Sequence, residues 1–179
     1  STMAAAESMA AQYGAATMAV AQLCQQELGV AVLGDSGFMV IRQAEGCFQV
    51  AERSKEQQHG FNFPYQLMNL PPALLARAKK EKGYRSDTVA DCELYRISPC
   101  SGDLILLYTD GFVDNMEESE ILEVVEQFCA GVLEGSDDDP SLLAKELAEA
   151  AHRKSMNPSV DVPFGVAARA AGFEHSGGE

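Results

Sequence analysis

The sequence has 179 residues, of which 46% are hydrophobic, and its formal net charge at pH 7 is −14. This size and composition predict one globular domain and argue against an intrinsically disordered chain. The acidic balance argues against nucleic acid as a partner, because a polyanion is repelled by a surface of its own sign.

The first fifty residues predict a helix followed by a β-meander. Residues 3–13 are strong helix formers, and Gly14 would end that helix. Short apolar runs follow with polar turns between them, which is typical of antiparallel strands joined by hairpins. These runs are residues 15–22, 28–33, 38–42 and 47–52.

The rest of the chain predicts strands and helices around an irregular stretch. Residues 53–88 show no clean period, and such a stretch inside a small domain is often functional. Strands grouped together with helices outside them predict an α+β fold, in one domain over 1–179 that ends in a flexible tail over 172–179. The expected elements are strands over 89–97 and 104–109, a polar turn over 110–115, helices over 118–133 and 142–154, and a last strand over 165–169.

The apolar runs and the cysteines indicate whether the chain spans a membrane and which redox compartment it occupies. No apolar run reaches the roughly 20 residues of a membrane-spanning helix, so no span is expected. The five cysteines form no Cys-x-x-Cys pair, which argues against a zinc site or a disulfide framework and favours a reducing compartment. We expect most of these thiols to be buried or half-buried.

Three acids are candidate metal ligands because each lies at the end of a predicted strand beside Gly or Pro. They are Asp35, Asp110 and Asp161. Carboxylates without His or Cys select hard cations such as Mg²⁺ or Mn²⁺, and Gly111 would let the backbone approach the ion. For each acid alone an ordinary turn is the favoured interpretation, and Asp114 could merely cap the following helix.

Other acids form runs that we interpret as a solvated face rather than a binding site, because metal ligands must be held by a core. A generic Ca²⁺ site is disfavoured, since the sequence has no EF-hand loop. The runs comprise Glu117, Glu118, Glu120, Glu123 and residues 137–139.

Taken together and in order, these motifs resemble the metal-dependent 2C (PPM-type) serine/threonine protein phosphatases over residues 5–171. The segments that carry the resemblance are Gly34-Asp-Ser-Gly-Phe-Met-Val40, Gly102-Asp103 through Thr109-Asp-Gly-Phe-Val-Asp-Asn115, and Asp161-Val-Pro-Phe-Gly-Val-Ala-Ala-Arg169. Gln57-Gln-His-Gly-Phe-Asn-Phe-Pro-Tyr-Gln-Leu67 resembles the subgroup that includes mitochondrial and chloroplast members, so the resemblance implies an organelle.

The resemblance implies a β-sandwich flanked by helices (α-β-β-α) with a binuclear Mg²⁺ or Mn²⁺ centre. A metal-activated water would hydrolyse phosphoserine or phosphothreonine in a phosphoprotein substrate. By resemblance, Asp110 and Asp161 would ligate one catalytic metal. Asp35 and Asp114 would lie near a weaker third metal or support the ligands from behind.

The loop over 53–88 is the expected determinant of substrate choice. His59, Asn62 and Tyr65 are its substrate-loop candidates. For His59 a packed, structural role is favoured over proton transfer, because a lone His among Phe, Tyr and Pro is usually buried. No protein nucleophile is expected, since no Ser-His or Cys-His arrangement is evident.

The family's N-terminal Ala-Asp-Gly-Val-Gly-Gly motif, with its bridging aspartate, is absent from the sequence, as are the strands that carry it. We therefore expect a partial domain with N-terminal strands missing. Either the chain belongs to a longer phosphatase, or a partner chain covers the exposed edge. The alternative function is an inactive pseudophosphatase that serves as an interaction subunit.

Overall fold

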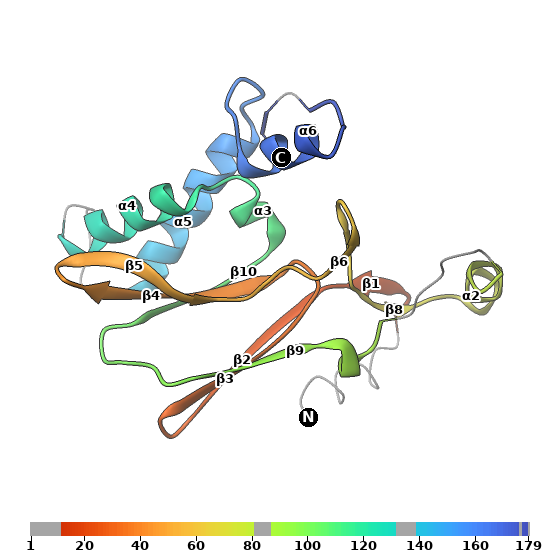
Figure 1. Ribbon diagram of the computed structural model, residues 1–179, viewed down its shortest axis with the longest axis horizontal. Helices are drawn as coiled ribbons and strands as arrows, with labels where there is room; N and C mark the ends of the chain where they lie inside the picture. Colours follow the sequence, from red (N-terminus) through yellow and green to blue (C-terminus); the bar gives the residue numbers. More distant parts are fainter. Residues whose placement is uncertain (1–11, 81–86, 132–138, 176, 179) are drawn as a thin grey trace. The chain divides into compact units, whose positions relative to one another are not determined.

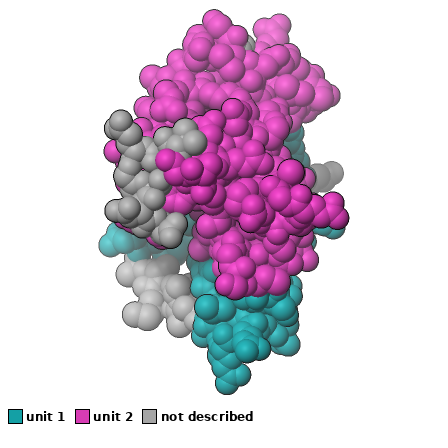
Figure 2. Space-filling model, turned by 90° about the vertical axis from the view of Figure 1, so that its left-hand side faces the viewer, with its two compact units in different colours: residues 1–38, 54–99 teal, residues 39–53, 100–179 magenta. Residues whose placement is uncertain are grey.

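The computed structural model describes residues 12–80, 87–131, 139–175 and 177–178, and combines small β-sheets with helices (Figure 1). The helix expected over 3–13 lies almost wholly outside the described residues, and Gly14 begins a strand. Figure 2 colours two compact units: unit 1 comprises residues 1–38 and 54–99, and unit 2 comprises residues 39–53 and 100–179. A single domain over 1–179 stays a prediction.

Unit 1 consists mainly of strands. Its largest sheet has the order β2-β3-β9, while β1 pairs with β8 and β6 with β7. In chain order the elements are β1 (Gly14–Ala16), β2 (Met18–Cys24), β3 (Glu27–Leu33), β6 (Gln58–Gly60), β7 (Phe63–Pro64), β8 (Leu67–Asn69), α2 (Pro72–Ala78), a 3₁₀ turn (Val89–Asp91) and β9 (Glu93–Ile97).

The β2–β3 hairpin confirms the sequence prediction. Cys24 pairs with Glu27 across a two-residue turn in which Gln25 has φ 56°. Alternate residues of β3 are buried on one face, namely Leu28, Val30 and Val32. This period of two follows from the strand geometry and explains why the pattern could be recognised in the sequence.

Two predictions for the middle of the chain were wrong in detail. The stretch 53–88 is not irregular throughout, because it contains β6, β7, β8 and the helix α2, which begins with Pro72 at its first position. The strand expected over 89–97 begins only at Glu93. Residues 89–91 form a 3₁₀ turn instead of a strand. The side chains of Thr88 and Asp91 each accept a hydrogen bond from the backbone of the other and so cap this turn.

Unit 2 combines one sheet with several helices. The sheet has the order β10-β4-β5, and most of β4 belongs to unit 2. The elements are β4 (Gly37–Ala44), β5 (Cys47–Arg53), β10 (Leu104–Tyr108), α3 (Asp110–Val113), α4 (Glu118–Cys129), α5 (Pro140–Ser155) and α6 (Pro163–Ala170). The two strands and two helices predicted for residues 38–52, 118–133 and 142–154 are thus confirmed, apart from their ends.

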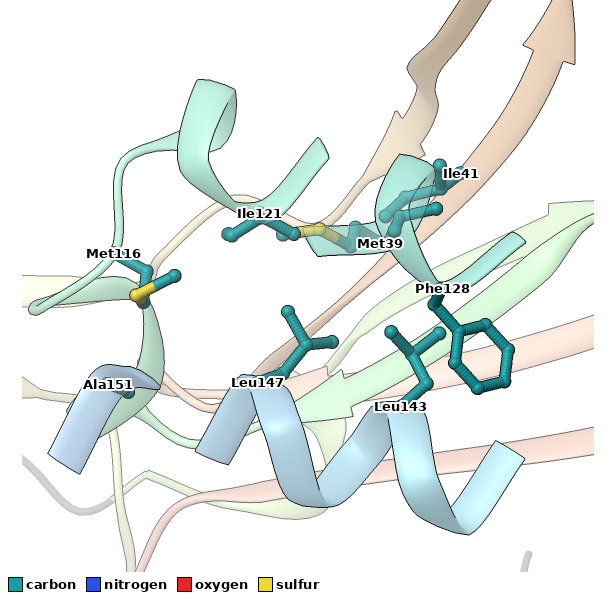
Figure 3. Packing of buried hydrophobic residues seen from close by; sticks show 9 residues of the cluster. Met39, Ile41, Met116, Ile121, Phe128, Leu143, Leu147 and Ala151 are labelled. Atoms are coloured by element: carbon teal, nitrogen blue, oxygen red, sulfur yellow. The ribbon is translucent and has the colours of Figure 1, made fainter. Parts of the chain in front are cut away.

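The core of unit 2 joins the sheet to α4 and α5, as Figure 3 shows. Helix α4 buries residues at i, i+4 and i+7, and α5 buries residues at i, i+4 and i+8, so each presents one apolar stripe. The cluster comprises Met39 and Ile41 from β4, Met116, then Ile121, Val125 and Phe128 from α4, and Leu143, Leu147 and Ala151 from α5.

The strand expected over 165–169 was wrong, because these residues lie in helix α6 (Figure 1). Pro163 occupies the first helical position, where its missing N–H costs nothing, and the Ala-Ala-Arg-Ala run that follows favours helix. Gly165 and Ala168 form the buried side of α6. The flexible tail stays a prediction, although the Phe173 N–H donates to the Ala168 carbonyl at 2.9 Å.

The expectation of buried thiols was also wrong. Cys92 is half-buried, whereas the other free cysteines are exposed: Cys24, Cys47, Cys100 and Cys129. Among the described helices, none is both long and apolar enough to cross a membrane.

A partly buried ion pair joins the turn before β10 to β4. Arg42 donates from Nε and Nη2 to the two carboxylate oxygens of Asp103, at 2.8 and 2.7 Å. The Asp103 side chain is 2% exposed and also accepts from the Cys100 N–H at 2.8 Å. The hydrogen bonds from Arg42 hold the pKa of Asp103 below its ordinary value, because they favour the charged carboxylate.

We expect Asp103→Asn to lower the urea midpoint of unfolding at pH 7, since the charged acceptor of a bidentate pair is lost. The folded pKa lies below the unfolded value of about 3.9, so the stabilisation is complete above that value and fades as pH falls through the folded pKa. The gap between wild type and variant should therefore shrink between pH 5 and about pH 2. Glu149→Gln, on an exposed pair of α5, is the control. A gap that stayed constant with pH would contradict this account.

Candidate metal-binding carboxylates

Asp110 begins helix α3 directly after the end of β10. Thr109 is still extended, at φ −99° and ψ 167°, and Asp110 is the first residue to turn into the helix. The Gly111 N–H donates to Asp110 Oδ1 at 2.8 Å, which orients the carboxylate. Asp110 and Gly111 are both exposed, so a solvent-borne ion can approach them. The expected polar turn over 110–115 is thus one turn of helix.

Asp114 lies one helical turn beyond Asp110 and ends α3. Its N–H donates to the Asp110 carbonyl at 2.8 Å, and residues at i and i+4 share one face of a helix. Asn115 is fully buried and donates from Nδ2 to the Gly111 carbonyl at 3.0 Å, which closes the same turn. The alternative of Asp114 as the cap of the following helix was wrong, because Glu117 caps α4.

Asp35 belongs to unit 1, where it follows β3. Gly34 has φ 90°, which turns the chain out of the strand, and Asp35 is 7% exposed. The hydroxyls of Thr17 and Ser36 are 2.7 Å apart, so they hydrogen bond across the turn. The predicted position of Asp35 at a strand end is therefore confirmed.

Asp161 precedes a helix instead of a strand. Its Oδ1 accepts from Arg169 Nη2 at 2.6 Å, and the Asp161 side chain is 73% exposed. Asp161 was selected because carboxylates at strand ends can converge on one point. This reason does not apply to a residue that precedes a helix. A role as metal ligand stays a prediction from the family resemblance, and a cation there would compete with a guanidinium.

The substrate-loop candidates lie on and around the β6–β7 hairpin. His59 is on β6 and stacks on Tyr65, with ring centroids 4.1 Å apart and an interplanar angle of 16°. Its Nε2 lies 2.9 and 3.0 Å from the two carboxylate oxygens of Asp87. Asn62 occupies the turn with φ 49°, a conformation that Asn adopts more readily than most residues. Contact with substrate stays a prediction for these residues.

The candidate acids supply only part of a metal site. Within the described ranges, no three His, Cys, Asp or Glu side chains form a group that could hold one. Asp110 and Asp114 offer two carboxylates on one turn of α3, and Mg²⁺ often binds one or two carboxylates together with water and phosphate oxygens. The described residues thus fit part of a ligand set.

The acidic run before α4 serves the helix. Glu117 and Glu120 form a capping box, and Lys154 from α5 donates to both carboxylate oxygens of Glu120 at 2.8 and 2.7 Å. Acids in a first turn also interact favourably with the helix dipole. Glu117, Glu118 and Glu123 are exposed, as the interpretation of a solvated face expects, whereas Glu120 is half-buried; residues 137 and 138 lie outside the described residues.

Sequence reasoning missed the partners of the candidate residues. Asp87 hydrogen bonds with His59, Gln57 with Gly34, and Arg169 with Asp161. The first two pairs join residues 28 and 23 positions apart, so no local pattern indicates them. Only the Thr88-x-x-Asp91 cap follows a recognisable sequence signature.

Comparison with known proteins shows that the chain is similar to 2C-type phosphatases. It is 32% identical over 166 residues to "Probable protein phosphatase 2C 55" of Arabidopsis thaliana, a match that covers 93% of this chain and 31% of that protein. It is 37% identical over 167 residues to "Protein phosphatase PTC7 homolog fig" of Drosophila melanogaster, covering 92% and 49% respectively. No protein-family model matches the chain.

A solved structure gives the fold. The chain superposes on the photosystem II phosphatase PBCP with a TM-score of 0.77 at 28% identity, over 99% of this chain and 64% of that one. This likeness confirms the predicted mixed fold of the 2C class. Sequence and structure together show that the chain resembles protein phosphatases of the 2C type over nearly its whole length. The chain spans half or less of the length of the curated relatives described here.

We expect Gly34→Ala to destabilise the protein more than Gly46→Ala. Both glycines have positive φ, 90° and 88°, so both variants share a backbone cost of about 1–2 kcal/mol. A Cβ on Gly34 would also lie 2.4 Å from the Tyr65 carbonyl oxygen, whereas nothing lies within 4 Å of a Cβ on Gly46. Chemical denaturation of both variants measures the difference; equal losses would show that the Asp35 turn has room to adjust.

Proposed function

We propose that the chain forms part of a metal-dependent protein serine/threonine phosphatase. The observation that carries the proposal is its similarity to proteins named as 2C phosphatases over more than nine-tenths of its length. The relatives' names give no support to the alternative of an inactive pseudophosphatase. The substrate would be a phosphoprotein that carries phosphoserine or phosphothreonine.

We further propose that Asp110 binds the metal and that Asp114 supports it from the same turn of α3. Exposure of Asp110 and its orientation by the Gly111 N–H support this assignment. Because these ligands are carboxylates, Mg²⁺ or Mn²⁺ is the expected ion. The remaining ligands would come from outside the set that the described residues bring together.

When bound, such a cation supplies a water of lowered pKa and neutralises phosphate charge. The contribution of this chain is to hold carboxylates at fixed positions. The buried amide of Asn115 fixes the Gly111 carbonyl, and the bond between the Asp114 and Asp110 backbones fixes the turn that carries both acids. Preorganised ligands of this kind need little rearrangement during the reaction.

An organelle, either mitochondrion or chloroplast, is the proposed location. The support is the subgroup segment over 57–67 and the similarity to a protein described as a photosystem II phosphatase.

We expect Asp110→Asn to lower the Mn²⁺-dependent hydrolysis of a phosphoserine peptide by the full-length gene product at least about 100-fold, because even residues that only support metal ligands contribute about 10–100-fold. Glu149→Gln, on the exposed face of α5, should leave the rate unchanged. A folded Asp110→Asn variant with the wild-type rate would refute the assignment of Asp110.

The same assay decides the role of Asp161. If Asp161→Asn also lowers the rate and weakens activation by Mn²⁺, Asp161 is a metal ligand as the resemblance implies. If the rate stays at the wild-type value, the ion pair with Arg169 is its role.

A further inference from the structure

The turn that carries Asp35 is held by a distant glutamine. The Gly34 N–H donates to Gln57 Oε1 at 3.1 Å, and the Gln57 N–H donates to the Gly34 carbonyl at 2.9 Å. The amide of Gln57 also donates from Nε2 to the Asp91 carbonyl at 2.8 Å. Gln57 therefore fixes both backbone groups of Gly34, the residue directly before Asp35.

Tyr65 lies against the same turn. Its N–H donates to the Gln57 carbonyl at 2.9 Å, and its carbonyl oxygen would be 2.4 Å from a Cβ on Gly34. The backbone of Tyr65 and the side chain of Gln57 thus enclose Gly34 from two sides. Movement of Tyr65 would release both contacts at once.

His59 and Asp87 hold Tyr65 in this place. The Tyr65 ring stacks on the His59 ring, and the carboxylate of Asp87 lies within hydrogen-bonding distance of His59 Nε2. Asp87 Oδ2 also accepts from the N–H of Gln66 at 2.9 Å, so it holds the backbone next to Tyr65 as well. The His59 and Asp87 side chains are only 9% and 7% exposed.

The other ring nitrogen of His59 argues against a role in proton transfer. Nδ1 is buried, and no residue in the described part of the chain hydrogen bonds to it. Since Nε2 faces Asp87 and Nδ1 faces no solvent, neither nitrogen is available to a substrate. His59 therefore contributes a contact with the Asp87 carboxylate and a ring face that stacks on Tyr65.

We propose that His59 and Asp87 are positioning residues for the Asp35 turn, and that they act through Tyr65 and Gln57. The contacts form one continuous path within unit 1, from the Asp87 carboxylate through two stacked rings to the backbone of Gly34. The consequence for the metal rests on the proposed function, because it requires that Asp35 serve the metal centre. The mechanical part of the proposal does not require it.

Amide hydrogen exchange tests the path without relying on activity. We expect Tyr65→Leu to speed exchange of the Gly34 and Gln57 amides by on the order of tenfold, because local opening of the turn becomes easier. Tyr65→Phe keeps the stacked ring and should leave exchange unchanged. His59→Phe keeps an aromatic face but cannot donate to Asp87, and should resemble Tyr65→Leu. The Val125 amide in α4, within unit 2, is the internal reference.

Two results would overturn the proposal. One is equal exchange at Gly34 and Gln57 in Tyr65→Leu and Tyr65→Phe. The other is acceleration that includes Val125 to the same extent, since this would indicate general loss of stability. Wild-type exchange in His59→Phe would remove the His59–Asp87 pair from the path and overturn the proposal in its stated form.

The metal consequence has a separate readout. In the full-length gene product, Tyr65→Leu should raise the Mn²⁺ concentration for half-maximal phosphatase activity, while the surface control Glu149→Gln should leave it unchanged. If the wild type has no phosphatase activity, the proposed function fails, and hydrogen exchange still decides whether His59 and Asp87 position the turn.

Discussion

Packing of α4 and α5 against β4 is the constraint on which unit 2 depends. Met39 and Ile41 from the strand meet the apolar stripes of both helices in one buried cluster. This packing and the Arg42–Asp103 pair hold the two ends of β10, one through the preceding turn and the other through the helices that follow. The position of Asp110, directly after β10, thus depends on a cluster of hydrophobic side chains and on one ion pair.

In unit 1, polar contacts hold the turn that carries Asp35. Its Asp35 turn has a glycine at positive φ, enclosed by Gln57 and Tyr65. Hydrogen bonds have direction, so they can hold a backbone carbonyl and N–H at specific places where apolar packing alone would allow sliding. The two units therefore present their acids by different means, one through a hydrophobic cluster and the other through a network of polar side chains.

The sequence allowed the β2–β3 hairpin and helices α4 and α5 to be predicted, because each has a strong local period or a clear cap. Asp139 followed by Pro140 is an example, since Asp accepts from the Ser141 N–H and Pro takes the first helical position. Helix α6 was mistaken for a strand although Pro163 gave the same signal. The strand prediction gave too little weight to the helix propensity of the alanine-rich run that follows Pro163.

Prediction of the site was limited in a different way. Asp35 and Asp110 were predicted because each follows a strand, and Asp114 because the family resemblance includes it; their role as metal ligands stays a prediction. Their supports were not found, because the Gln57–Gly34 and His59–Asp87 contacts join segments that only the folded chain brings together. For Asp161 only the expected strand was wrong: a helix follows it and Arg169 is its partner, while its role as a metal ligand stays a prediction from the family resemblance.

Binding of Mn²⁺ to the full-length gene product, followed by electron paramagnetic resonance or calorimetry, tests the central claim most directly. We expect saturable binding that Asp110→Asn weakens by at least about tenfold, the lower end of the effect of residues around a metal site. Glu149→Gln should bind as the wild type does. Equal Mn²⁺ affinity in wild type and a folded Asp110→Asn variant would contradict the claim that the end of β10 contributes to a metal centre.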